Sequence, residues 1–356
     1  MDVWSLPEES KLDNETLLML ENKIVSTTLP VVYSILVLIS IPGNLLSLWI
    51  LIFHSKPITS SIILMINLSL TDFVLAIFLP FQIIYNINNN HWIFGTWLCN
   101  IVSVLFYANM YISILTIMSI SIERYLGVVH PMKASTWRRK RYAVAAICFI
   151  WIFTLALLYP LISTDLTYEV KHLNITTCFD ILKWNMLPNL VYWAIFIGGL
   201  FMCLFLIPLI VTVVCYVCII WTLVKCSNRR GTGQEKRSIK LAIMVLVVFV
   251  TCYAPNNFIL LIHTICRLFY YKSYYHAYKL TLTLSCLSSC LDPFLYYFAS
   301  KDFYKKVLEV WNRSFKRNKS YEGRRGSLFS ATFSNEQVEA LENGNGHKHN
   351  LQQSDL

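Results

Sequence analysis

The sequence predicts an all-α membrane protein, in which a bundle of seven transmembrane helices is followed by a short amphipathic helix on the inner leaflet. Three quantities support this fold class: 56% of the 356 residues are apolar, 14% are charged, and the mean hydropathy is +0.53. Soluble domains contain roughly 25% charged residues. The composition therefore argues against a large soluble enzyme and against a disordered chain.

Seven apolar segments are long enough to cross the hydrocarbon core of a bilayer, for which a helix needs about 20 residues. Five of them contain no Asp, Glu, Lys or Arg, the second contains Asp72, and the seventh contains Lys279 and Asp292. Their continuous rather than alternating apolar character excludes a β-barrel. Prolines inside six of them predict kinked helices. The predicted spans are Leu29–Phe53, Ser61–Tyr85, Leu98–Ile122, Ala143–Ile162, Asn189–Val224, Leu241–Ile265 and Tyr278–Phe298.

The basic residues orient these spans. With the N-terminus outside, all but seven of the 30 Lys and Arg residues fall on the inner side, as the positive-inside rule expects. The formal net charge of +10 is therefore explained by membrane topology, and it calls for no nucleic-acid partner. We expect a multi-pass protein of the plasma membrane with an extracellular N-terminus.

The topology divides the chain into four segments. Residues 1–28 lack the basic and apolar regions of a cleaved signal peptide, so we expect the first span to act as the insertion signal. After the last span, apolar side chains can share one face of a short basic helix that would lie on membrane lipid. The expected segments are an extracellular tail at 1–28, a seven-span domain at 29–300, an amphipathic helix at 301–312 and a disordered cytoplasmic tail at 313–356.

Several residues on the expected outer side suggest covalent modification. Asn14 and Asn174 each begin an N-x-[ST] sequon, where glycosylation can occur. Cys99, Cys178 and Cys266 lie on the same side. A disulfide between Cys99 and Cys178 suits an oxidising environment, and it would leave Cys266 without an assigned role.

Short motifs occur in a fixed order along the predicted spans. They are Gly43-Asn44 in the first, Leu68–Asp72 in the second, Trp92–Gly95 after it, Cys99 and Glu123-Arg124-Tyr125 at the ends of the third, Trp151 and Pro160 in the fourth, Pro208 and Tyr216 in the fifth, Phe249–Pro255 in the sixth, and Asp292-Pro293-x-x-Tyr296 in the seventh. Together they resemble the class A, rhodopsin-like G-protein-coupled receptors over residues 29–312. The resemblance implies a receptor that binds an extracellular ligand and activates heterotrimeric G proteins.

Within this class the chain is similar to the purinoceptor-like branch, which includes nucleotide, lysophospholipid and protease-activated receptors. Tyr253 and Asp292 replace the commoner Trp and Asn, as in that branch. Segments such as Phe106–Tyr111 look closest to one orphan-like member. Many relatives act through the twelve/thirteen class of G proteins toward Rho. We expect the same coupling here, with receptor kinases and arrestin acting on the cytoplasmic tail.

The resemblance also implies a switch near the inner ends of the spans. Arg124 stays protonated, and adjacent Glu123 can pair with it until the sixth span swings outward and Arg124 meets a G protein. The structural alternative is an interfacial arginine that extends to the lipid head groups. The expected coupling and switch residues are Glu123, Arg124, Tyr125, Pro131, Met132, Tyr216, Phe249, Tyr253, Pro255, Asp292, Pro293 and Tyr296.

Candidate ligand-binding residues lie in the outer halves of the spans. Most are aromatic, which suits a small extracellular amphiphile, and Lys183, Arg267 and Lys279 could hold its anionic head group. Two structural alternatives are that the tyrosines pack in the interfacial aromatic belt and that Lys279 extends to the outer surface. The other candidates are Tyr85, Phe106, Tyr107, Met110, Tyr111, Trp193, Asn256, Asn257, Leu260, His263, Tyr275 and Tyr278.

Two other functions compete with an amphiphile receptor. Nucleotide-binding members of the branch carry a His and a basic residue in the outer sixth span, where this chain has Asn257 and Leu260. Such members often use a second outer disulfide as well, and no N-terminal cysteine is present to pair with Cys266. A membrane transporter or channel would need more polar groups along a midplane pathway and commonly shows inverted repeats.

Asp72 and Asp292 are the deepest acidic residues, and intramembrane carboxylates mark functional sites. The resemblance implies an allosteric sodium ion at Asp72, with Ser113, Ser288, Ser289 and Asp292 around it, and oxygen ligands suit such a hard cation. The alternative is that one carboxylate is protonated and hydrogen-bonded. No other cofactor is expected. The sequence has no phosphate-binding glycine loop, no metal-spaced His/Cys set and no nucleophile triad, so we expect no catalytic residue.

Overall fold

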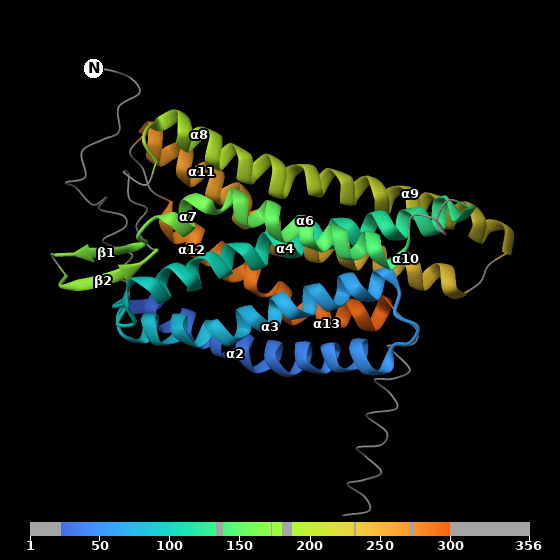
Figure 1. Cartoon of the computed structure of the whole chain (residues 1–356), viewed down its shortest axis with the longest axis horizontal. Coiled ribbons are helices and arrows are strands. Elements are labelled where there is room, and N and C mark those ends of the chain that lie inside the picture. Colours follow the sequence, from blue (N-terminus) through green and yellow to red (C-terminus); the bar gives the residue numbers. More distant parts are fainter. Residues whose placement is uncertain are drawn as a thin grey trace, which may run out of the picture. The chain divides into compact units, whose positions relative to one another are not determined.

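The computed structural model describes residues 23–132, 138–171, 173–179, 187–230, 233–270 and 274–299 (Figure 1). The helices are α2 (Lys23–Trp49), α3 (Ser60–Ile87), α4 (Gly95–Val129), α6 (Lys140–Leu157), α7 (Tyr159–Ser163), α8 (Leu190–Gly199), α9 (Ile207–Arg230), α10 (Gly233–Val248), α11 (Ala254–Tyr270), α12 (Tyr275–Cys286) and α13 (Ser288–Ala299). Three π-helical turns, η1 (Ile50–His54), η3 (Leu200–Leu206) and η4 (Phe249–Tyr253), continue helices, and two strands, β1 (Thr167–Val170) and β2 (Ile175–Cys178), form a hairpin.

The helical segments confirm the predicted fold class. Six segments of the described chain are long and apolar enough to cross a membrane, and they match the first six predicted spans. The seventh predicted span is divided between α12 and α13, which are separated at Leu287. The tail at residues 1–22 and the expected amphipathic helix at 301–312 lie outside the described residues.

The bundle exposes apolar side chains and buries polar ones. Leu38, Ile152 and Trp221 are among the exposed apolar side chains, whereas Asn44 and Asp72 are fully buried. Because hydrocarbon offers no hydrogen bonds, a helix in it must satisfy its backbone internally and turn its polar side chains toward other helices. The distribution of polarity is therefore that of a protein solvated by lipid.

Helix α4 is the central helix of the bundle. Every residue from Phe106 to Ile117 is buried, because α4 contacts α3, α6, α9 and the hairpin along its length (Figure 1). A helix that is buried on all faces can be apolar all round. Its outer half therefore faces a space shared by several helices, where a ligand site can form.

Prolines account for the breaks in three spans. A proline has no N–H, and its ring clashes with the carbonyl four residues earlier. The wider turns η3 and η4 each end two residues before a proline, Pro208 and Pro255, and α6 ends shortly before Pro160. The helices are thus interrupted near three of the six prolines, whereas Pro42, Pro80 and Pro293 lie inside α2, α3 and α13.

The hairpin is attached to the outer end of the bundle by several bonds, one of which is covalent. A disulfide joins Cys178 of β2 to Cys99 of α4, which confirms the predicted bond. The Trp92 amide donates a 2.7 Å hydrogen bond to the Thr176 carbonyl, and the Thr176 amide donates to His91 Nδ1 at 3.0 Å. These bonds fix β2 beside the outer ends of α3 and α4.

Candidate functional site

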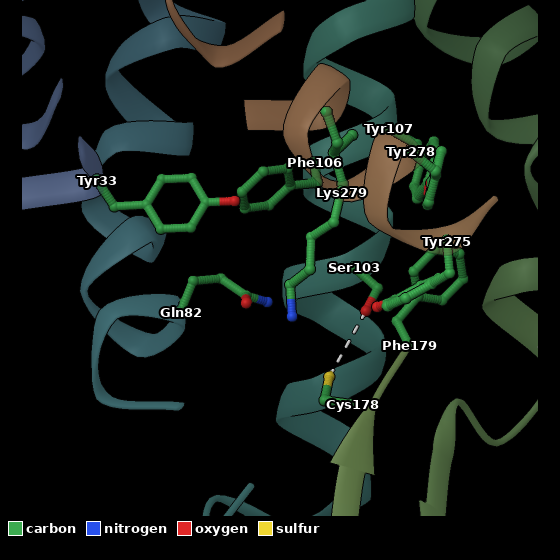
Figure 2. Close-up of a pocket in the computed structure, with 11 residues that line it drawn as sticks. Tyr33, Gln82, Ser103, Phe106, Tyr107, Cys178, Phe179, Tyr275, Tyr278 and Lys279 are labelled. Carbon is green, nitrogen blue, oxygen red and sulfur yellow. Dashed lines mark hydrogen bonds between the residues drawn. The ribbon is translucent and has the colours of Figure 1, made fainter. Parts of the chain in front are cut away.

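A pocket lies between α2, α3, α4, α12 and the end of β2 (Figure 2). Its empty space is about 450 Å³, including the part that is open to solvent. The lining residues are Tyr33, Gln82, Ser103, Phe106, Tyr107, Cys178, Phe179, Tyr275, Tyr278, Lys279 and Leu282.

Lys279 supplies a buried cation to this pocket. Only 6% of the residue is exposed, so its side chain does not extend to the outer surface. Its Nζ lies 5.4 Å from the ring centroid of Tyr85 and 6.0 Å from that of Tyr275, within the range of cation–π attraction. Figure 2 shows the side chain running from α12 into the pocket, with Gln82 on one side of its end and Ser103 on the other.

The walls of the pocket are aromatic and are held in edge-to-face pairs. Tyr33 packs on Phe106 with centroids 6.3 Å apart, and Tyr107 packs on Phe179 at 5.1 Å. Such pairs restrict the rings and present apolar faces to a ligand. The Tyr33 hydroxyl is also hydrogen-bonded to Thr283 Oγ1 at 3.0 Å, which joins α2 to α12.

The structure places five of the ligand candidates in the pocket lining, namely Phe106, Tyr107, Tyr275, Tyr278 and Lys279. Two more lie directly behind it. Tyr85 is beside the Lys279 ammonium, and His263 is stacked on Tyr278 with centroids 5.8 Å apart.

Other candidates form a separate buried layer. The Asn256 side-chain amide donates to Met110 Sδ at 3.2 Å, and that of Asn257 donates to the Tyr253 carbonyl at 2.9 Å. Tyr111, Trp193 and Leu260 are buried outside the pocket lining. Lys183 lies outside the described residues, and the Arg267 side chain is likewise not described, so neither is assigned to the pocket.

Sequence reasoning missed six lining residues, which are Tyr33, Gln82, Ser103, Cys178, Phe179 and Leu282. Tyr33 was interpretable only as part of the first span, because a continuously apolar segment does not reveal which face points inward. Phe179 had a usable signal. It follows Cys178 directly, so the predicted disulfide already placed it near the outer end of α4.

The two deep carboxylates lie among buried oxygen atoms. Asp72 Oδ1 accepts a 3.0 Å hydrogen bond from Asn109 Nδ2. Asp72 Oδ2, both carboxylate oxygens of Asp292 and the Ser113 hydroxyl have no hydrogen-bond partner among the described residues. Ser288 and Ser289 donate their hydroxyl protons to backbone carbonyls, and the Ser289 hydroxyl also accepts a 3.2 Å hydrogen bond from Ser40.

Buried polar atoms of this kind are normally satisfied. The oxygen-rich donor set therefore fits a hard cation such as sodium, or a proton shared by the carboxylates. Among the described residues, no group of three or more His, Cys, Asp or Glu side chains is arranged to hold a metal ion.

At the inner end of the bundle, Glu123 has different partners from the expected one. Arg138 donates Nε–H to Glu123 Oε1 at 3.0 Å, and the Ser61 hydroxyl donates to the other carboxylate oxygen. No ion pair between Glu123 and Arg124 is found in the described part of the chain. Adjacent residues on a helix do not face each other, so Arg124 does not meet Glu123. Arg138 instead passes over Gly127 to reach Glu123. A side chain at position 127 would crowd it, because a Cβ there would lie 3.1 Å from the Arg138 Nη1.

The remaining switch candidates divide between the core and the inner surface. Tyr216, Phe249 and Tyr253 are buried, and Tyr125 is hydrogen-bonded to His130 Nε2 at 3.1 Å. Met132 is 90% exposed just beyond the inner end of α4, beside Pro131. Pro255 is the second residue of α11, Pro293 lies in α13, and the side chain of Tyr296 is not described.

Comparison with known proteins places these features in context. The family described as 7 transmembrane receptor (rhodopsin family) matches residues 43–296. Purinoceptor 8 of Gallus gallus is 61% identical over 321 residues, which cover 90% of each chain. The S-geranylgeranyl-glutathione receptor of Homo sapiens is 52% identical over 94% of this chain and 93% of its own. Proteinase-activated receptor 1 of Xenopus laevis is 36% identical over 76% and 63%.

Proposed function

The chain belongs to the rhodopsin family of seven-transmembrane receptors, and on that premise we propose that it binds an extracellular anionic amphiphile, a lipid or a lipid conjugate. Its family and relatives are receptors and not enzymes. The observation that favours this ligand class is the burial of Lys279 in an aromatic-walled pocket. The name of the human relative, S-geranylgeranyl-glutathione receptor, supports a lipid conjugate.

The pocket chemistry suits both ends of such a ligand. A buried ammonium attracts an anionic head more strongly than an exposed one, because little water screens the pair. Apolar ring faces from Tyr33, Phe106 and Phe179 can receive the lipid part. A purely hydrophilic ligand would leave these rings without apolar contact.

We propose that the inner side activates a heterotrimeric G protein of the twelve/thirteen class toward Rho. Met132 and Pro131 would enter a groove of the G protein, and Arg124 would meet it after the sixth span moves outward. Receptor kinases and arrestin would act on the tail beyond residue 312. This mechanism requires a plasma-membrane receptor with an extracellular N-terminus.

We also propose an allosteric sodium ion near Asp72. The unpartnered oxygens of Asp72, Asp292 and Ser113, with Ser288 and Ser289 beside them, would hold it. A bound cation would offset two buried negative charges that are otherwise costly in a membrane core.

The ligand class is tested by Rho activation in cells that express the full receptor. We expect S-geranylgeranyl-glutathione to activate the wild type, and Lys279→Gln to raise its half-maximal concentration roughly tenfold or more, because the head loses its ion pair. Lys171→Gln is the matched control, since Lys171 is an exposed lysine in the turn of the hairpin. A receptor that responds only to a pool of nucleotides would contradict the amphiphile proposal.

Coupling is tested separately on purified receptor and G protein. We expect Arg124→Ala to abolish guanine-nucleotide exchange while agonist binding stays within about twofold, because Arg124 lies far along α4 from the pocket residue Tyr107. If the Arg124→Ala receptor catalysed guanine-nucleotide exchange at the normal rate, Arg124 would have no part in coupling and would be only an interfacial arginine.

A further inference from the structure

We propose that His263 is a positioning residue of the pocket, because its Nδ1 holds the beginning of α12 and the lining residues that this helix carries. Those residues include Tyr275, Tyr278 and Lys279. His263 itself is not among the described residues that line the pocket. The expected effect on agonist binding rests on the proposed function, whereas the role of His263 in holding α12 does not.

The sequence of α12 does not cap its own beginning. Tyr274 is the N-cap residue, and its side chain makes no capping hydrogen bond. In a capping box, a Glu or Gln three residues after the N-cap accepts a hydrogen bond from the N-cap backbone N–H. That position is Ala277, which has no side-chain acceptor. The Tyr274 N–H therefore has no acceptor of this kind within its own helix.

His263 supplies the acceptor from the neighbouring helix α11. The Tyr274 N–H donates to His263 Nδ1 at 3.1 Å, and only 2% of His263 is exposed. A backbone N–H can only donate, so Nδ1 must present its lone pair and cannot carry a proton. Removing this nitrogen would take the bonded acceptor away from a donor at the start of α12, which is costly where water has little access.

The same imidazole packs on the aromatic wall of the pocket. It is stacked on the Tyr278 ring with centroids 5.8 Å apart and planes 11° apart, and it lies 6.3 Å from the Tyr275 ring. Both tyrosines are buried and line the pocket. One side chain of α11 therefore holds the backbone and the rings of α12 together. A change at His263 would shift the pocket wall without any contact between His263 and a ligand.

Three substitutions separate the acceptor nitrogen from the ring. His263→Asn keeps an acceptor, because Asn bears its oxygen on Cγ, as His bears Nδ1. His263→Gln bears its oxygen one carbon further out, toward the place of Nε2. His263→Phe keeps a ring for stacking but has no acceptor. His276→Phe is the matched control, since His276 is an exposed histidine on α12.

Amide hydrogen exchange of the purified full receptor tests the positioning role without a ligand. In peptides that span Tyr274 to Tyr278, we expect His263→Phe and His263→Gln to exchange roughly tenfold or more faster than the wild type. His263→Asn should stay within about threefold of the wild type, and His276→Phe should match it. Unchanged exchange in His263→Phe would overturn the inference. Restoration by Gln but not by Asn would also overturn it, because Nε2 would then be the nitrogen that matters.

Agonist potency tests the consequence for binding. In the Rho assay with S-geranylgeranyl-glutathione, His263→Phe and His263→Gln should raise the half-maximal concentration roughly tenfold, and His263→Asn should restore it to within about threefold. Surface labelling verifies that each variant reaches the cell surface. Equal loss of potency in all three variants would overturn the acceptor role, as would wild-type potency in all three. A wild-type receptor that ignores this agonist would contradict the proposed function instead, and the hydrogen-exchange result would then decide the inference.

Discussion

The side-chain amide of Asn44 on α2 donates a 2.9 Å hydrogen bond to the backbone carbonyl of Ser289 on α13. In an uninterrupted helix that carbonyl would accept from the N–H four residues later. The residue at that position is Pro293, which has no N–H. Asn44 therefore replaces a missing backbone donor from a neighbouring helix. Gly43 allows the approach, since a Cβ there would lie 3.3 Å from the Pro293 ring.

This relationship predicts a non-additive effect on stability. Asn44→Ala leaves a buried carbonyl without its donor and should lower the unfolding free energy by about 1–3 kcal/mol. In a Pro293→Ala background the cost should shrink, because the backbone N–H restored by that substitution can bond the same carbonyl. The double-mutant cycle is measured by thermal unfolding, in detergent, of the wild type, the two single variants and the double variant. Ser47→Ala on the same helix is the control, and an equal cost in both backgrounds would refute the replacement.

A second prediction concerns the Glu123–Arg138 ion pair. Arg138→Ala removes the contact that ties the segment before α6 to α4, and with it a restraint on the loop that carries Met132. Arg138 is 41% exposed, so we expect only a modest loss of stability. Guanine-nucleotide exchange should fall severalfold while agonist affinity is kept.

Arg139→Ala is the matched control for this experiment, because it removes a neighbouring exposed arginine. Arg138→Lys should restore part of the exchange rate, since it keeps the charge but loses the planar fork. If Arg138→Ala exchanged as fast as the wild type, the pair would have no part in coupling.

A third prediction concerns sodium. Replacing sodium chloride by choline chloride at constant ionic strength should change agonist potency in the wild type. In Asp72→Asn the same replacement should have no effect, because the anionic oxygen that would hold the ion is gone. Radioligand binding at graded sodium concentrations measures this. A wild-type receptor that is insensitive to sodium would favour a shared proton between Asp72 and Asp292.

A fourth prediction concerns the disulfide that holds the hairpin. Cys178→Ser should reduce agonist potency, because Phe179 follows Cys178 and packs on Tyr107 in the pocket wall. The double variant Cys99→Ser, Cys178→Ser should lose no more agonist potency than either single variant, since each substitution removes the same disulfide. Cys266→Ser serves as the control, because Cys266 is a free cysteine. Potency measured on surface-expressed receptor decides between these outcomes.

The membrane bundle could be predicted from the sequence, because a bilayer requires spanning segments of a certain length and low polarity, and both properties follow directly from the residues. The spans around Asp72 and Lys279 were found despite their charges. The break between α12 and α13 at Leu287 was not predicted, since the hydropathy of a segment does not depend on whether its helix is interrupted. Proline positions signalled the breaks near Pro160, Pro208 and Pro255, because the proline ring removes a backbone hydrogen bond.

The candidate site was only partly predictable. Lys279 and Tyr278 were identifiable as unusual residues near the outer end of a span. Tyr33 was not, because its contribution depends on α2 lying beside α12, and one sequence does not specify that packing. Glu123 was assigned to its neighbour Arg124, although three-dimensional proximity favours Arg138, which is fifteen residues away.

The π-helical turn η4 has a mechanical consequence for the inner face of the receptor. Below it, α10 extends for 16 residues without another joint, a rigid arm of about 24 Å at 1.5 Å per residue. A bend of about 15° at η4 would therefore move the tip of α10 sideways by roughly 6 Å, a distance similar to the pitch of one helical turn. Above the joint, Leu260 and His263 lie about 10 and 15 Å from Tyr253, the last residue of η4, so they would move through a shorter arc than the tip of α10. The same rotation at η4 therefore displaces the far end of α10 about twice as far as these residues, by leverage alone.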